Sequence, residues 1–247
     1  MLRSWVGGWT DRRAVAPIVA EMAGTFLFFF VGIGAVAMLD SFANHGLTVD
    51  FAAGFIVIAL AHGIALAVLA SALGAVSGAH FNPAVTFAIW LSGKMAWHRA
   101  AAYVVAQLIG GIFAALAVQY VFHVNTTSLG LPVLNVDVLP GILVEIILTV
   151  VLVIAVFGTT VDPRGPKLGG LAVGFAVTAD ILMGITLTGA AMNPARWFGP
   201  AAVTGNWVNG EVWIIGPLLG AAIVALAYRF LFAPVEEPAK EPAGETA

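Results

Sequence analysis

The sequence contains no cysteine and little charge, and each shortage excludes a class of function. Without cysteine among its 247 residues, the chain has no disulfide, thiolate metal site or cysteine nucleophile. Only 9% of the residues are charged, against about 25% in soluble domains. The formal charge of −3 gives no reason to expect a nucleic-acid partner. What is abundant is apolar: 61% of the residues, with a mean hydropathy of +1.01, so we expect a membrane protein surrounded by a lipid bilayer.

Six apolar stretches are long enough to cross a bilayer, which takes about 20 residues. They are about 14–39, 49–73, 98–122, 139–158, 168–188 and 211–233. Two shorter stretches, 82–92 and 193–203, each begin at Asn-Pro-Ala and predict half-helices that enter the membrane and stop. Irregular backbone at that depth is tolerated where it lines a water-filled cavity or is buried in protein. We expect an all-α membrane protein with six transmembrane helices and two re-entrant half-helices, forming a single channel domain over residues 1–233.

The basic residues predict the topology, because nine of the ten fall on one side of this arrangement. They are Arg3, Arg12, Arg13, Lys94, Arg99, Arg164, Lys167, Arg229 and Lys240. The positive-inside rule makes that side cytoplasmic and places both termini there. Residues 234–247, rich in Pro, Ala and Glu, are predicted to be a disordered cytoplasmic tail. We expect the protein in the cell membrane.

The chain also repeats itself. Glu21-Met22-Ala23-Gly24-Thr25 opens the first span and Glu145-Ile146-Ile147-Leu148-Thr149 opens the fourth. The repeats cover about 14–122 and 139–233, and each contains three spans and one Asn-Pro-Ala. An odd number of spans inverts the second copy, so the two half-helices should meet near the midplane from opposite sides.

Each Asn-Pro-Ala is predicted to start a helix, because Asn is a strong N-cap and Pro suits the first helical position. The motifs are Asn82-Pro83-Ala84 and Asn193-Pro194-Ala195. In an inverted pair, two positive helix ends and two Asn amides point at the channel centre, where they repel cations and bond neutral water. A single motif would indicate only a plain N-cap. Two at matched places favour a channel.

At this point the sequence resembles the aquaporin (major intrinsic protein) family over about residues 14–233. Ser77-Gly78-Ala79-His80-Phe81-Asn82-Pro83-Ala84-Val85-Thr86 is similar to the family's first loop signature, and Met192-Asn193-Pro194-Ala195-Arg196 to its second. We expect a prokaryotic-type member of this family. The resemblance implies a homotetramer with one pore in each subunit. It also implies pore-lining backbone carbonyls at Gly78, Ala79, His80, Gly189, Ala190 and Ala191.

The resemblance further implies a selectivity filter, which family spacing places at His62, Ile181, Ala190 and Arg196. This set differs from Phe, His, a small residue and Arg, which is typical of strict water channels. It also differs from the glycerol facilitator set of Trp, Gly, Phe and Arg, in which Asp follows the arginine, because here Trp197 follows it. It resembles the filter of plant vacuolar-membrane aquaporins, many of which pass ammonia. We therefore hypothesise a channel for water and other small neutral solutes such as ammonia.

The polar residues in and around the filter can also be interpreted as structural. Arg196 could extend to the outer surface, and a lone His such as His62 often bonds a neighbouring helix. Glu21 and Glu145 are interpreted as acceptors for the N–H groups of the re-entrant loops, although buried carboxylates also serve as proton relays in pumps. Asp180 is a possible filter modulator, because a carboxylate near His62 would favour imidazolium. Alternatively, it bonds a neighbouring helix.

Three other functions are alternatives to a water and ammonia channel. A glycerol or urea facilitator shares the family, and a secondary transporter shares inverted repeats and broken helices. A membrane enzyme would need an assembled nucleophile, metal cluster or carboxylate pair, whereas the five His are scattered along the chain. We expect no enzyme activity, no cofactor and no bound metal.

Overall fold

The computed structural model describes residues 12–123 and 129–234, and all regular structure in them is helical. The first repeat contains α1 (Arg12–Asn44), α2 (Phe51–Ser77), α3 (Pro83–Leu91) and α4 (Trp97–Phe122). The second contains α5 (Val138–Val156) with η3 (Phe157–Val161), α6 (Leu171–Thr188), α7 (Pro194–Thr204) and α8 (Gly210–Ala227) with η4 (Tyr228–Phe232). Six of these helices are long and apolar enough to span a membrane. The expected tail, apart from Pro234, lies outside the described residues.

Local chemistry explains where the helix ends depart from the predicted ones. The second span starts at Phe51 rather than 49, because the Asp50 carboxylate accepts the Ala53 N–H at 3.0 Å and caps α2. α6 starts at Leu171 rather than 168, after Gly169 turns the chain at φ +59°. The first span continues to Asn44, five residues beyond its predicted end at 39.

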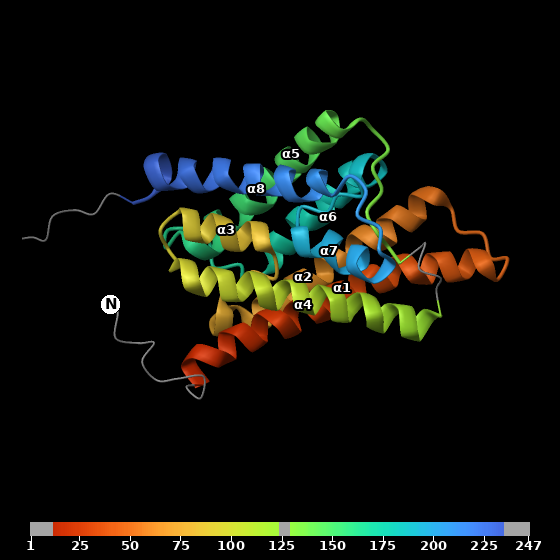
Figure 1. Cartoon of the computed structure of the whole chain (residues 1–247). Helices are drawn as coiled ribbons and strands as arrows, with labels where there is room; N and C mark the ends of the chain where they lie inside the picture. The colour runs from red at the N-terminus through yellow and green to blue at the C-terminus, as the bar shows by residue number, and fades with distance from the viewer. Residues whose placement is uncertain (1–11, 124–128, 235–247) are drawn as a thin grey trace, which may run out of the picture.

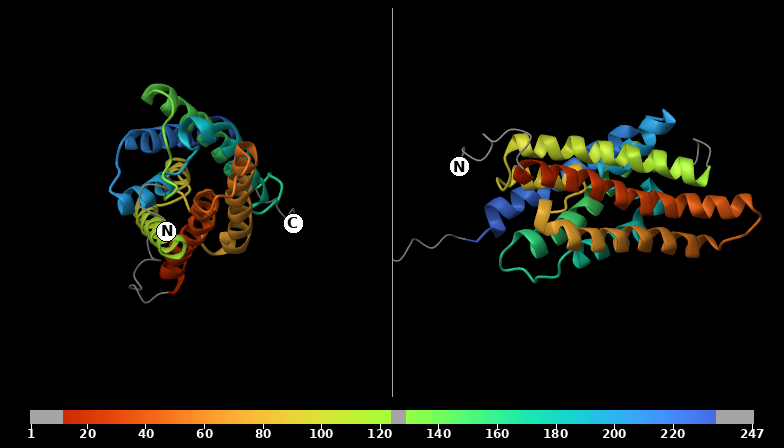
Figure 2. Two further views of the ribbon diagram at one scale, coloured as in Figure 1. Left: turned by 90° about the vertical axis from the view of Figure 1, so that its right-hand side faces the viewer. Right: turned by 90° about the horizontal axis from the view of Figure 1, so that it is seen from below.

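The two repeats pack in the same pattern, and the half-helix of each repeat packs against a helix of the other (Figure 1). α1 packs against α4 and α2, and α5 packs in the same way against α8 and α6. α2 and α6 join the halves. α3 packs against α8 of the other repeat, and α7 against α4 of the other repeat. The spans run roughly along one axis, which Figure 2 views from one end in its left panel. This crossed packing is what the predicted inverted repeat requires.

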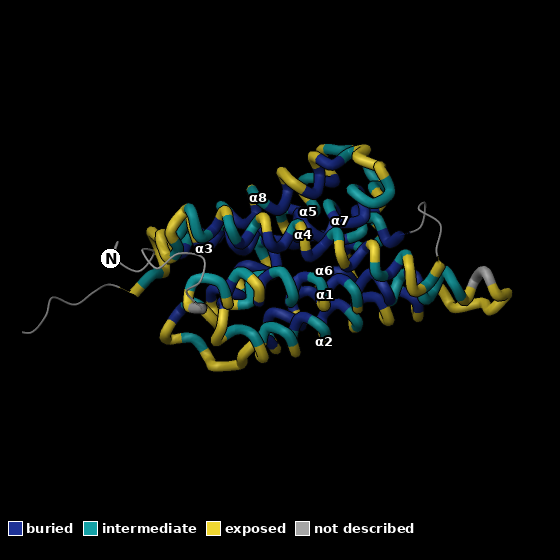
Figure 3. Tube along the Cα trace, turned by 60° about the horizontal axis from the view of Figure 1, so that its bottom comes forward, coloured by how far each residue is buried: buried dark blue, intermediate teal, exposed yellow. Residues whose placement is uncertain are grey.

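Glycines permit the closest approaches between helices. At Gly199 of α7, an added Cβ would lie 2.4 Å from the Gly111 carbonyl oxygen of α4. At Gly174 of α6, it would lie 2.3 Å from the Gly63 carbonyl oxygen of α2. Small residues allow such contact in membranes, where packing rather than the hydrophobic effect drives helix association. Exposed residues alternate with buried ones along the outer helices (Figure 3), and many of the exposed residues are large and apolar, as a lipid-facing surface requires.

A substitution at the Gly199–Gly111 contact tests the packing of α7 against α4. Gly199→Ala is expected to lower the free energy of unfolding by about 1–3 kcal/mol, because the new methyl group meets backbone that cannot rotate away. Gly158→Ala is the matched control, since its Cβ would meet nothing within 4 Å and should leave stability unchanged or slightly raised. Thermal unfolding in detergent, followed by circular dichroism, measures both. Equal midpoints for the two variants would contradict the packing described.

Candidate functional site

Both half-helices begin with the same cap. Asn82 precedes α3 in an extended conformation, and its Oδ1 accepts the Ala84 N–H at 2.8 Å. Asn193 precedes α7 in the same way, and its Oδ1 accepts the Ala195 N–H at 3.0 Å. The proline that follows each Asn occupies the start of its helix, where a missing N–H costs nothing. The two helix N-termini, with their positive dipole ends, are therefore built identically.

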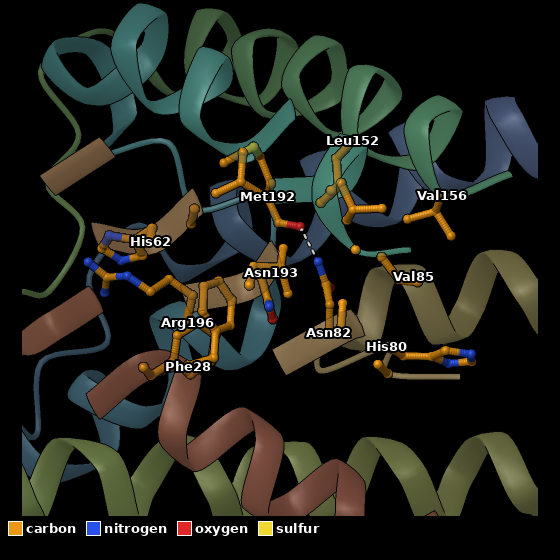
Figure 4. A pocket seen from close by; sticks show the side chains of 18 of the residues that line it. Phe28, His62, His80, Asn82, Val85, Leu152, Val156, Met192, Asn193 and Arg196 are labelled. Atoms are coloured by element: carbon orange, nitrogen blue, oxygen red, sulfur yellow. Dashed lines mark hydrogen bonds between the residues drawn. The ribbon is translucent and has the colours of Figure 1, made fainter. Parts of the chain in front are cut away.

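The two Asn side chains bind each other's loops. Nδ2 of Asn82 donates to the Met192 carbonyl at 2.9 Å, shown as a dashed line in Figure 4, and Nδ2 of Asn193 donates to the Phe81 carbonyl at 2.9 Å. Because each Oδ1 must accept a backbone N–H, the orientation of each amide is fixed. Each NH2 group has a second hydrogen that these bonds do not use. The repeats are thus locked together at the start of both half-helices.

The loops before the two motifs have matching, uncommon backbone conformations. Gly78, Ala79 and Phe81 have positive φ angles of 91°, 50° and 46°. Gly189, Ala190 and Met192 follow with 75°, 47° and 51°. A non-glycine residue in the left-handed region costs on the order of 1–3 kcal/mol unless its surroundings enforce it. Four such residues in two matched loops require firm support.

Glu21 of α1 supports the first loop. Its Oε1 accepts the Ser77 hydroxyl at 2.6 Å and the His80 N–H at 2.9 Å, and its Oε2 accepts the Phe81 N–H at 2.7 Å. Gln107 of α4 also donates to Oε2, at 2.8 Å. The carboxylate is fully buried and accepts all four of these bonds. This geometry is that of a loop support.

Glu145 of α5 supports the second loop through the same bonds. Its Oε1 accepts the Thr188 hydroxyl at 2.7 Å and the Ala191 N–H at 2.9 Å, and its Oε2 accepts the Met192 N–H at 2.7 Å. Glu145 is also fully buried. Inversion of the repeat therefore extends to individual hydrogen bonds, and the two carboxylates replace the ladder partners that these N–H groups lack.

Sequence reasoning missed the hydroxyl and ring groups that complete these supports. The hydroxyls of Ser77 and Thr188 each accept the N–H two residues later, at 3.0 and 3.2 Å. Tyr103 donates its hydroxyl to the Ser77 carbonyl, and Trp213 donates its indole N–H to the Thr188 carbonyl, both at 2.9 Å. The signal was available, since Ser77 and Thr188 occupy the same position relative to their motifs.

A cavity of about 810 Å³ passes between the repeats and contacts all the predicted filter and carbonyl residues. Both motif asparagines line it, together with His62, Ile181, Ala190, Arg196, Gly78, Ala79, His80, Gly189 and Ala191. Figure 4 shows His62, Arg196 and Phe28 on one side of the Asn pair and His80 on the other. The charged side chains among its lining residues are Lys94, Lys167 and Arg196, with no carboxylate among those described.

All four predicted filter residues line the cavity, and the surroundings of the His62 ring and the Arg196 guanidinium are defined. Nδ1 of His62 lies 2.9 Å from the Ile58 carbonyl, which can only accept, so in a neutral ring Nε2 is left as an acceptor. The ring packs edge-on to Phe28, with centroids 6.0 Å apart, and fits against Gly32, which has no side chain to displace it. Arg196 is buried, and its Nη1 has no hydrogen-bond partner among the described residues.

Asp180 lies outside the cavity lining. It is buried in α6 beside Ile181, and no described residue hydrogen-bonds its Oδ2. The structure therefore gives no direct contact that would support its predicted influence on His62, and that influence stays a prediction.

Comparison with known proteins identifies this architecture. The major intrinsic protein family matches residues 9–228. The chain belongs to the major intrinsic protein family. It is 42% identical over 238 residues to the probable aquaporin TIP3-2 of Arabidopsis thaliana, covering 93% of this chain and 88% of that one. It is 40% identical over 229 residues to aquaporin TIP4-4 of Zea mays, covering 90% and 89%.

A solved structure has the same fold as this chain. The aquaglyceroporin from Plasmodium falciparum superimposes with a TM-score of 0.78, covering 90% of this chain and 98% of that one, at 22% identity. At that identity the likeness concerns the fold alone. The sequence relatives named above are plant proteins, so they lend no support to the expectation of a prokaryotic-type aquaporin. Family membership makes the chain a multi-pass membrane channel protein.

A substitution of Glu145 tests whether the second loop depends on its carboxylate. Glu145→Gln is expected to lower both thermal stability and water permeability, because an NH2 group would face N–H donors and leave buried groups unpaired, at about 1–3 kcal/mol. Glu211→Gln is the control, since Glu211 is exposed at the start of α8. Light-scattering stopped flow on proteoliposomes with matched protein content measures permeability. Unchanged stability and permeability in Glu145→Gln would show that the loop does not depend on this carboxylate.

Proposed function

We propose that this aquaporin conducts water and ammonia passively and excludes protons and ions. The observation that carries the proposal is a cavity with two Asn-capped helix starts at its centre and, among its described charged lining residues, only cations. A cation entering it meets positive helix ends and Arg196 and leaves its hydration shell without gaining a carboxylate partner. A neutral molecule meets hydrogen-bond donors and acceptors that replace the bonds it made to water.

We assign the roles of the site residues accordingly. The second N–H of Asn82 and of Asn193 bonds the permeant at the centre. The backbone carbonyls of residues 78–80 and 189–191 line the path on either side as acceptors. His62, Ile181, Ala190 and Arg196 form the filter. Glu21 and Glu145 hold the loops and do not act as proton relays.

The filter's chemistry favours ammonia beside water. Ammonia has three N–H donors and one lone pair, so it can donate to Nε2 of His62 while accepting from Nη1 of Arg196. Ile181 and Ala190 give the filter apolar walls without an aromatic ring. The filter is therefore wider, and a solute less polar than water enters it at a lower free-energy cost. A glycerol or urea facilitator is the alternative, and the aquaglyceroporin likeness supports it only at the level of fold.

The assembly and the membrane are also proposals. The family resemblance supports a homotetramer with one pore in each subunit. The end that carries Lys94, Lys167 and Arg229 is proposed to face the cytoplasm by the positive-inside rule. The TIP-type relatives and the filter's resemblance to vacuolar-membrane aquaporins favour a vacuolar membrane over the cell membrane expected at first.

Permeability measurements on one set of proteoliposomes test the proposed solutes. Water and ammonia should cross faster than in empty vesicles, with a low activation energy and no saturation, whereas a secondary transporter would saturate. Glycerol and urea, measured in parallel, should cross more slowly. Ammonia-driven alkalinisation no faster than in empty vesicles would remove ammonia from the proposal, and rapid glycerol flux would favour the alternative.

A filter substitution should change the ratio of the two solutes. Ile181→Phe is expected to lower ammonia permeability several-fold and water permeability less, because a ring restores the bulk that this filter lacks. Leu182→Phe adds the same ring on the next residue of α6, which is exposed, and should change neither. A proportional fall of both solutes in Ile181→Phe would mean that Ile181 does not select between them.

A further inference from the structure

A second hydrophobic core, separate from the main one, lies beside the filter, and we call it the Trp core. Its buried residues come from the second loop, α7 and α8: Ala191, Trp197, Ala201, Val212 and Trp213. Two of them are direct neighbours of filter residues in the chain, since Ala191 follows Ala190 and Trp197 follows Arg196. The Trp core is therefore placed to fix two parts of the filter from behind.

Arg196 and Trp197 point in different directions from the first turn of α7. Successive side chains of a helix are about 100° apart, because one turn contains 3.6 residues. Arg196 lines the cavity on the same side of the Asn pair as His62 (Figure 4), whereas Trp197 does not line it and is only 4% exposed. The ring is closely packed, because a Cβ added at Gly210 of α8 would lie 2.4 Å from it. The Trp197 ring therefore holds the turn that carries the filter arginine.

The Trp213 ring joins Trp197 to the loop that carries Ala190. The two indole rings are stacked, with centroids 6.2 Å apart and planes inclined by 20°. Trp213 Nε1 donates to the Thr188 carbonyl at 2.9 Å, and the Thr188 hydroxyl in turn bonds Glu145. Trp197 makes no equivalent bond, because its Nε1 is buried without a hydrogen-bond partner among the described residues. What Trp197 contributes is thus the contact of its ring.

We propose that the stack of Trp197 on Trp213 determines solute specificity: it sets the distance between Arg196 and the second loop, and so keeps larger neutral solutes out. Both sides of the filter are connected to the stack, one through the backbone of α7 and the other through the Thr188 carbonyl. Close-packed side chains transmit such a constraint, because they leave no room for relaxation. Trp197 is a positioning residue, since it does not line the cavity. Its effect on solutes rests on the proposed channel function.

Removing the Trp197 ring should widen the filter. In Trp197→Ser, the first turn of α7 can move into the vacated space, so urea and glycerol permeability should rise several-fold relative to water permeability. Trp197→Phe keeps a ring and removes only an N–H that has no partner among the described residues, so its solute ratios should match those of the unmodified protein. Trp90→Ser is the matched control, because Trp90 is a partly exposed residue of the other half-helix, α3. Stopped flow on proteoliposomes with equal protein content measures all three solutes.

A double-mutant cycle tests whether the two rings act as one unit. Trp213→Phe keeps an aromatic ring and loses the bond to the Thr188 carbonyl, so it should also raise the ratio of urea to water permeability. Combined with Trp197→Ser, it should raise the ratio by less than the product of the two single effects, because both changes release the same connection. Full multiplication of the two effects would show that the residues act separately and would overturn the proposal.

The results distinguish a failure of this proposal from a failure of the channel function. An unchanged urea-to-water ratio in Trp197→Ser, with water still crossing, would overturn the role of the stack and leave the channel intact. A proportional fall of every solute would assign Trp197 to folding alone and would also overturn it. If Trp197→Ser does not fold, as thermal unfolding beside Trp90→Ser would show, the ratio in the milder Trp213→Phe decides. Absence of water flux from the unmodified protein would contradict the channel function itself.

Discussion

Irregular backbone deep in a membrane must find hydrogen-bond partners within the protein, and the rest of this structure follows from how that demand is met. The segments 78–81 and 189–192 have no helical ladder and carry left-handed residues. Two buried carboxylates, Glu21 and Glu145, accept their N–H groups. Lipid offers no substitute, and each unsatisfied group there costs several kcal/mol. The loops are therefore fixed by residues on the first helix of each repeat.

With the loops fixed, the half-helices can start face to face. Each motif Asn satisfies its own helix start with Oδ1 and the opposite loop with Nδ2, so neither repeat can set its loop without the other. Positive dipole ends are thereby held at the centre of a cavity where the low dielectric surroundings make them effective. The same bonds therefore give rigid support and, in the proposed function, the exclusion of charge. In the function proposed above, the outer filter residues act on a path whose centre already disfavours cations.

Much of this architecture could be predicted from the sequence, because long apolar stretches and N-cap chemistry are local signals. The six spans and both half-helices are confirmed, with ends that move by a few residues where Asp50 caps or Gly169 turns the chain. Support by Ser77 and Thr188 was not predicted, since a hydroxyl's partner depends on tertiary contacts. Trp213 was not predicted to support a loop either, yet its indole N–H holds the second loop as the Tyr103 hydroxyl holds the first. Asp180 shows where prediction from sequence ends: it is adjacent to Ile181 in the sequence, yet it does not line the cavity.

The most direct test of the account compares proton and water flux in the same proteoliposomes. An imposed pH gradient and an osmotic step would be applied to vesicles of increasing protein density, with an entrapped pH dye reporting proton entry. The account predicts that water permeability rises with protein density while proton flux stays at the level of empty vesicles. Proton flux that rises in proportion to water permeability would contradict the claim that the paired Asn-capped helix starts admit neutral molecules and reject cations.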